Sequence, residues 1–348
     1  MDLYIGSYTS NDVTEPQGIT RWSFDPDSGA IALHGVALDL ASPTWVVASS
    51  DGTRLYAVTE VNGGYVVAIA RDPESGDLTE LNRVSSCGDA PCYASLTADE
   101  RFVLVANYSS ATIGVLPVLA DGTLGDAVSR AAHTGSSVVT DRQGEAHAHQ
   151  IVQSPDGDSV LVCDLGMDQV VVYPFDRATG NLGEATTLDL HPGAGPRHLA
   201  FGPDGRAVFI INELDSTVVA ATWDGATRAL TPFQTISTLP AGVTDTNYPS
   251  QILVSPDGRF VYGANRLHDT VVAYAVDSAS GTLSAIGWAN VGAYPRNIAF
   301  DPSASWVVSS GQNDGTLTLL ARDAESGLLE PVGEPIAVPA PAIAVFIP

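Results

Sequence analysis

The side chains best suited to acid–base and anion-binding chemistry stand at matching places in the sequence. His149 and Arg197 each stand at the start of a short apolar run, and Glu213 and Arg266 each stand at the end of the following one. A histidine has an unperturbed pKa near 6.5 and can serve as a general base at neutral pH. Guanidinium groups can hold a phosphate or a carboxylate through paired hydrogen bonds. This combination indicates a site that binds an anion and moves a proton.

The elements that must position these residues form a repeated unit. Its clearest copy is PRHLAFGPDGRAVFIINE (196–213), in which a proline precedes an apolar run, a turn and a second apolar run. Asp-Gly between two such runs is a strong hairpin signal. A second marker, a turn followed by leucine or a near equivalent, occurs at SGAI (28–31), SGDL (75–78), DGTL (121–124), TGNL (179–182), TRAL (227–230), SGTL (280–283) and SGLL (326–329). The sequence therefore holds seven units of about 47 residues, the period of a four-stranded propeller blade.

This repeat predicts an all-β protein, a single seven-bladed β-propeller over residues 1–348 with four antiparallel strands per blade. No helical period is apparent. The chain ends on PAIAVFIP (341–348), which matches the first half of the unit, and begins with LYIGSYT (3–9), which matches the second half. We expect the C-terminal segment to supply the inner strand of a blade whose outer strands come from the N-terminus, which closes the ring.

The hairpin geometry also predicts where a site lies. The residue after the proline position starts the innermost strand, and the residue sixteen positions later ends the second strand, so the two should lie opposite each other at one mouth of the channel. Seven units give fourteen such positions. They are Thr44, Cys92, His149, Arg197, Ser250, Arg296 and Ala342 at strand starts, and Tyr8, Glu60, Tyr108, Leu165, Glu213, Arg266 and Gln312 at strand ends. Three of the fourteen are arginine, in a chain with only 15 cationic residues among 348.

Two other interpretations of this cluster remain open. The arginines could merely pair with Glu60 and Glu213 and hold blades together, and the histidine could be structural. A metal held by His147, His149 and His198 is conceivable, because imidazole suits zinc and similar ions, but the neighbouring cations disfavour it. We therefore expect no metal and no cofactor. The segment 126–147 is an insertion that precedes the strand of His149, so it could form a rim over the mouth and influence specificity.

Composition narrows the class of partner. The formal net charge is −25, from 40 acidic and 15 basic residues. This balance disfavours a nucleic acid or an anionic membrane as partner. The three cysteines are sparse, and the first ten residues carry no secretion signal, so we expect a cytoplasmic protein. A small anionic lactone or carboxylate is the expected partner, and the chain is expected to be a monomer or a simple homo-oligomer.

The motifs along the chain resemble those of the seven-bladed propeller lactonase family, which includes propeller-type 6-phosphogluconolactonases and fungal carboxy-cis,cis-muconate cyclases. They are GSYT (6–9), ANYSSATIGV (106–115), HAH (147–149), DLGMDQVVVY (164–173), GPRHLAF (195–201), NEL (212–214), ANR (264–266) and YPRNIAF (294–300). The sequence departs from the family at 145–149, where EAHAH replaces the usual Pro-His-x-His.

This resemblance implies a catalytic set of His149, Arg197, Glu213 and Arg266, and it also marks Arg296 and Gln312 as typical site positions. We add His147, His198, Glu60 and Tyr108 as expected substrate-binding residues. The leading hypothesis is hydrolysis of a sugar lactone, most simply 6-phosphogluconolactone. The alternatives are a cycloisomerase or lactonase for a muconate-type dicarboxylate, and a propeller that binds an anion or a protein without chemistry, since a fold alone does not fix function.

Overall fold

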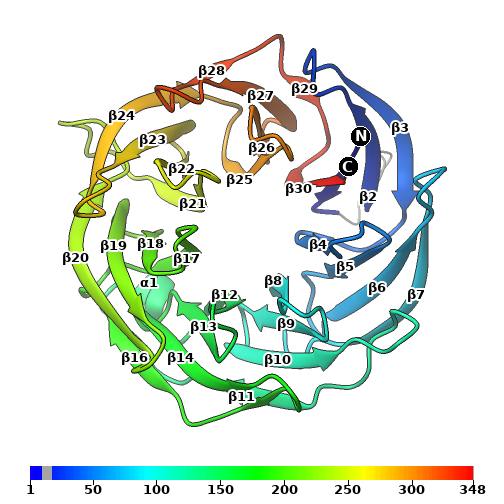
Figure 1. The fold of residues 1–348 in the computed structure, drawn as a ribbon, viewed down its shortest axis with the longest axis horizontal. Helices are drawn as coiled ribbons and strands as arrows, with labels where there is room; N and C mark the ends of the chain where they lie inside the picture. Colours follow the sequence, from blue (N-terminus) through cyan, green and yellow to red (C-terminus); the bar gives the residue numbers. More distant parts are fainter. Residues whose placement is uncertain (10–17, 348) are drawn as a thin grey trace.

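Seven antiparallel sheets stand around a central axis in the computed structural model, which describes residues 1–9 and 18–347 (Figure 1). The innermost strands are β4 (Val46–Ala48), β8 (Pro91–Leu96), β12 (Ala148–Gln153), β17 (Pro196–Phe201), β21 (Tyr248–Val254), β25 (Pro295–Phe300) and β30 (Pro341–Ile347). The second strands are β5 (Arg54–Val58), β9 (Phe102–Asn107), β13 (Ser159–Asp164), β18 (Ala207–Asn212), β22 (Phe260–Arg266), β26 (Trp306–Gly311) and β1 (Asp2–Ser7).

The outer half of each blade follows in the same order. The third strands are β6 (Tyr65–Arg71), β10 (Thr112–Pro117), β14 (Gln169–Asp176), β19 (Thr217–Asp224), β23 (Thr270–Val276), β27 (Thr316–Arg322) and β2 (Ile19–Phe24). The outermost strands are β7 (Leu78–Ser85), β11 (Ser129–Ala132), β15 (Asn181–Leu182), β16 (Thr186–Asp189), β20 (Ala229–Ser237), β24 (Leu283–Asn290), β28 (Leu329–Pro331), β29 (Ile336–Ala337) and β3 (Ile31–Leu38). The predicted seven-bladed propeller is confirmed, and in two blades the outermost strand is split into two short pieces.

The apolar runs of the sequence become strands that are buried on both faces. Every residue of β9 and β13 is buried, and the outermost strand β7 instead mixes buried and exposed positions. Neighbouring blades pack face to face, so a middle strand meets another sheet on each side and needs no polar face. The apolar clusters accordingly lie between successive blades rather than in one central core.

The ring closes as the two half-units predict. Strand β30 pairs antiparallel with β1, which gives one blade of order β3-β2-β1-β30 built from both ends of the chain. Leu3 and Ile5 of β1 are fully buried and pack with Val308 and Leu317 of the neighbouring blade. Closure therefore rests on a paired strand and on an apolar contact between the first and last blades.

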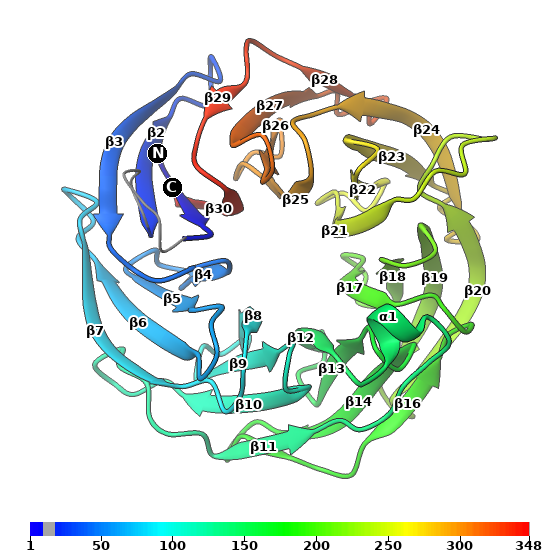
Figure 2. The ribbon, with the colours of Figure 1, turned by 180° about the vertical axis from the view of Figure 1, so that it is seen from behind.

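The insertion at 126–147 contains a single helical turn, α1 (Thr140–Gln143). Figure 2 shows α1 near the inner strand β17, on the face turned towards the viewer. The earlier part of the insertion forms the outermost strand β11, whereas α1 brings Arg142 to the pocket at one mouth of the channel. Among the helices of the described residues, none is long and apolar enough to cross a membrane.

The closing contact makes a stability prediction. Replacing Ile5 by Ala should lower the free energy of unfolding by about 2–5 kcal/mol, because it leaves a cavity between the first and last blades. Leu33→Ala is the matched control, since Leu33 on the outermost strand β3 is 54% exposed, and it should change the free energy by less than about 0.5 kcal/mol. Equal losses in denaturant melts of the two variants would contradict a special role for the closing contact.

Candidate active site

An extra residue interrupts the pairing of the inner strand in six of the seven blades. Pro196 pairs with Asn212 and His198 pairs with Ile211, so Arg197 stands between them without a partner in the register. Such a bulge bends the strand and turns a side chain in a new direction. The same irregularity falls at the strand start in five further blades, around Cys92, His149, Ser250 with Gln251, Arg296 and Ala342.

The expected pairing of Arg197 directly opposite Glu213 is therefore wrong. The bulge shifts the register, and Glu213 follows the last residue of β18 instead of pairing within the ladder. The two side chains nevertheless meet, because Arg197 Nε lies 3.1 Å from Glu213 Oε2. Strand-start and strand-end residues are brought together at the mouth by bulged geometry.

A pocket of about 250 Å³ opens at this mouth. Its lining residues are Tyr8, Glu60, Cys92, Tyr108, Arg142, His149, Glu213, Arg266, Tyr294 and Arg296. Six of the predicted residues are among them: Glu60, Tyr108, His149, Glu213, Arg266 and Arg296. The pocket brings a histidine, guanidinium groups and carboxylates within one small volume.

Glu213 is the centre of one charge cluster. Its carboxylate pairs with Arg266, Arg142 and Arg197, and its side chain is only 4% exposed. Burial by itself would raise the pKa of this carboxyl, but the three arginine charges outweigh burial and hold the pKa at about 2. Glu213 is therefore ionised at neutral pH and is a weak base.

Glu60 is the centre of a second cluster across the pocket. Tyr8 Oη donates to both of its carboxylate oxygens at 2.8 Å, and Arg296 Nη2 lies 3.3 Å from Oε2. The Arg296 guanidinium also lies over the Tyr8 ring at 4.9 Å. Burial by itself would lower the pKa of Arg296. The nearby Tyr8 and Glu60 oxygens outweigh burial and raise this pKa above its usual value, so the arginine stays charged.

His149 lies at the base of the pocket and is 5% exposed. Its Nδ1 is 3.8 Å from the sulfur of Cys92, and its ring meets Tyr108 edge to face. Burial, together with the charge of Arg197, holds the pKa of His149 well below its usual value of 6.5. The imidazole is therefore neutral at physiological pH and can accept a proton.

Arg197 lies beneath the pocket instead of lining it. It is 2% exposed, and its Nη1 donates to the Ser250 carbonyl at 2.6 Å. Burial and the charges of Arg266 and Arg296 lower the pKa of Arg197 to about 9, so it still carries its proton at neutral pH. Its positive charge therefore acts on the pocket from the buried side, next to the carboxylate of Glu213.

Three predicted binding residues do not line the pocket. His147 stacks on Tyr108 with ring centroids 4.3 Å apart, and its Nδ1 lies 3.0 Å from the Tyr108 carbonyl oxygen. His198 is buried below His149 and is hydrogen-bonded through Nδ1 to Gln251. Gln312 follows β26, where its backbone N–H donates to the Tyr294 carbonyl. The first two support lining residues through ring contacts.

Four lining residues were not among the site residues predicted from the sequence: Arg142, Tyr8, Tyr294 and Cys92. Tyr8 and Cys92 stand among the fourteen channel positions, so the repeat contained their signal. Tyr294 precedes a predicted strand, and Arg266 lies 4.9 Å above its ring. Arg142 comes from the part of the insertion that follows the repeat strand β11 and has no counterpart in the other units. In residues 1–9 and 18–347, no group of three or more His, Cys, Asp or Glu side chains is placed to hold a metal ion.

Comparison with known proteins identifies the family to which this chain is similar. The model of the family described as "Lactonase, 7-bladed beta-propeller" matches residues 2–346. A 6-phosphogluconolactonase from Bacillus subtilis is 35% identical over 99% of this chain and 97% of its own length. A 6-phosphogluconolactonase from Formosa agariphila is 28% identical over 97% of this chain and 96% of its own.

Solved structures agree over the whole chain. The structure of a periplasmic gluconolactonase from Pseudomonas aeruginosa superposes with a TM-score of 0.92 at 32% identity, covering 100% of this chain and 99% of that one. The match runs through all seven blades and both strands of the closing pair. The chain therefore belongs to the seven-bladed β-propeller lactonase family.

Proposed function

We propose that the protein hydrolyses a sugar lactone, most simply 6-phosphogluconolactone, to the open-chain acid. The observation that carries this proposal is the neutral, buried imidazole of His149 at the base of an arginine-rich pocket. The relatives named 6-phosphogluconolactonase support the same substrate. We further propose a cytoplasmic location, although the Pseudomonas relative is named as a periplasmic protein.

The pocket supplies the groups that ester hydrolysis needs. His149 takes a proton from a water molecule, and the resulting hydroxide attacks the lactone carbonyl carbon. The carbonyl oxygen becomes an oxyanion, which is stabilised by the Arg266 guanidinium in the pocket wall and by the charge of the buried Arg197 behind it. The bond from the carbonyl carbon to the ring oxygen then breaks, and the imidazolium returns its proton to that oxygen. The products are one carboxylic acid and one hydroxyl group, with no further reactant.

We assign Glu213 a positioning role in this reaction. With a pKa of about 2, its carboxylate has little affinity for a proton at neutral pH. It instead fixes three guanidinium groups that would otherwise repel one another. Removing it would leave buried positive charges without compensation, which is costly in a protein interior.

The lowered pKa of His149 suits both halves of the reaction once substrate is bound. In the free protein, burial and the Arg197 charge keep the imidazole neutral. An anionic substrate adds negative charge to the pocket and raises the pKa of His149 towards the working pH. A general base is most effective when its pKa lies near that pH.

The first prediction concerns turnover. Replacing His149 by Gln should lower kcat roughly 10²–10⁴-fold, the usual contribution of one acid–base group, with a smaller change in KM. The measurement is proton release in weak buffer after mixing with fresh 6-phosphogluconolactone, corrected for spontaneous opening. His34→Gln on the exposed face of β3 is the control and should turn over at the wild-type rate. Unchanged kcat in the His149 variant would remove His149 from the mechanism.

The second prediction concerns protonation of His149. Its imidazole resonance, assigned by its loss in His149→Gln, should titrate well below pH 6.5 in the free protein and at higher pH with 6-phosphogluconate bound. Because the folded pKa lies below the unfolded value, the unfolded chain binds more protons as pH falls, and His149 contributes stability that is lost below about pH 6.5. A free-protein titration at or above 6.5 would contradict a burial-lowered pKa.

A further inference from the structure

Arg142 differs from the other three arginines of the site in origin and exposure. It lies on α1 within the insertion, whereas Arg197, Arg266 and Arg296 occupy repeat positions. Its side chain is 32% exposed, against 2% for Arg197, 5% for Arg266 and 14% for Arg296. It is therefore the guanidinium at the open end of the pocket.

Arg142 and Arg266 both pair with Glu213, but Arg142 uses fewer of its N–H groups in other contacts with the protein. Arg266 donates to the Tyr248 and Pro249 carbonyls and to the Tyr294 hydroxyl, besides pairing with Glu213. Arg142 pairs with Glu213 through Nη2 and lies over the Tyr248 ring at 5.3 Å. The Tyr108 hydroxyl also lies close to the Arg142 guanidinium, and the other Arg142 donors face the pocket, whereas the donors of Arg266 are largely used by the protein.

The insertion holds Arg142 firmly in place. The neighbouring Gln143 is fully buried, and its Nε2 donates to the Leu165 carbonyl at 2.9 Å and to Asp168 Oδ1 at 2.6 Å. Asp168 is itself 3% exposed and also accepts from the backbone N–H groups of Gly193 and Gly195. Arg142 is thus presented on an anchored turn, so little ordering is needed when a ligand binds.

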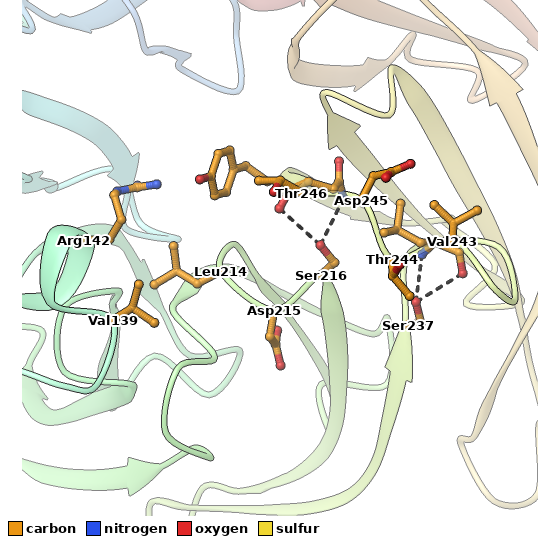
Figure 3. A pocket seen from close by; sticks show the side chains of 13 residues that line it. Val139, Arg142, Leu214, Asp215, Ser216, Ser237, Val243, Thr244, Asp245 and Thr246 are labelled. Carbon is orange, nitrogen blue, oxygen red and sulfur yellow. Dashed lines mark hydrogen bonds between the residues drawn. The ribbon is translucent and has the colours of Figure 1, made fainter.

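The charges on the two sides of Arg142 favour an anion in the active-site pocket over the neighbouring pocket beyond Arg142. Figure 3 shows Arg142 at one end of a second, outer pocket of about 440 Å³ that also contains Asp215 and Asp245. These two carboxylates disfavour a phosphate beyond Arg142. In and directly beneath the active-site pocket, four arginines (Arg197 is the one beneath) accompany two glutamates while His149 is neutral, which leaves an excess of two positive charges. A phosphate monoester carries nearly two negative charges at neutral pH.

We propose that Arg142 binds the phosphate of the substrate and so selects phosphorylated over unphosphorylated sugar lactones. This proposal rests on the proposed lactonase function. The carbonyl must reach His149 at the base of the pocket, and the phosphate on the exocyclic carbon then points towards the open end, where Arg142 lies. Arg142 acts as a specificity residue that touches the substrate away from the reacting bond.

The test compares two lactones in matched variants. Replacing Arg142 by Gln should lower kcat/KM for 6-phosphogluconolactone roughly 10- to 100-fold, mainly through KM, as expected for one charge-assisted hydrogen-bonded contact. For glucono-δ-lactone the change should stay within about threefold. Arg142→Lys keeps the charge and should recover part of the loss. Arg177→Gln removes a surface arginine, 57% exposed and paired with Asp158, and should change neither substrate.

Two outcomes would overturn the proposal. An equal loss for both lactones would mean that Arg142 acts only by positioning Glu213. No loss for either would place the phosphate elsewhere, with Arg296 as the remaining partly exposed guanidinium. Since two arginines still pair with Glu213 in the Arg142 variant, the site should stay folded, and a thermal melt checks this.

A binding measurement separates this proposal from the proposed function. Calorimetry of 6-phosphogluconate and gluconate requires no turnover. If the wild type hydrolyses neither lactone, the lactonase proposal fails, but a 10- to 100-fold weaker binding of 6-phosphogluconate alone in Arg142→Gln would still support phosphate recognition by Arg142. Equal weakening of both acids, or no binding of 6-phosphogluconate to the wild type, would overturn it.

Discussion

The site depends on the bulge at the start of the inner strand, which is present in six of the seven blades. A regular antiparallel ladder would alternate its side chains between the two faces of the blade, where they would pack against neighbouring blades. One extra residue breaks this alternation and turns the side chain towards the channel. His149 and Arg296 reach the pocket this way, and Arg197 reaches its base. The rigid blades then hold these groups in one geometry.

Charge compensation follows from that geometry. The inner strands of the seven blades meet at one narrow mouth. The arginine side chains from different blades therefore lie close together in a poorly hydrated space. Glu213 and Glu60 keep this arrangement stable by pairing with arginines on opposite sides of the pocket. Because the arginines outnumber the two acids, the pocket keeps a positive excess inside a chain whose net charge is −25. Local contacts, not the field of the whole protein, would therefore hold the proposed anionic substrate.

Much of the fold and part of the site could be predicted from the sequence because both follow the repeat. The hairpin turns set the blade period, and the half-units at 3–9 and 341–347 required the closing pair. The bulge at Arg197 was not predictable, since an extra residue leaves no mark in the pattern of apolar runs. Arg142 was missed for a different reason: it lies on an insertion, where position in the repeat carries no information. Gln312 satisfies the repeat but does not line the pocket.

The neutral state of His149 links the binding of an anionic group to the proposed activation of water. The cations that attract an anion also lower the pKa of the imidazole, so the empty pocket holds a base that is unprotonated but weak. In the proposed reaction, a bound anionic substrate offsets those cations and strengthens the base. A neutral lactone would leave the positive excess in place and the imidazole a poorer proton acceptor. In the proposed mechanism, recognition of the anionic substituent and activation of water are therefore two results of the same electrostatic balance.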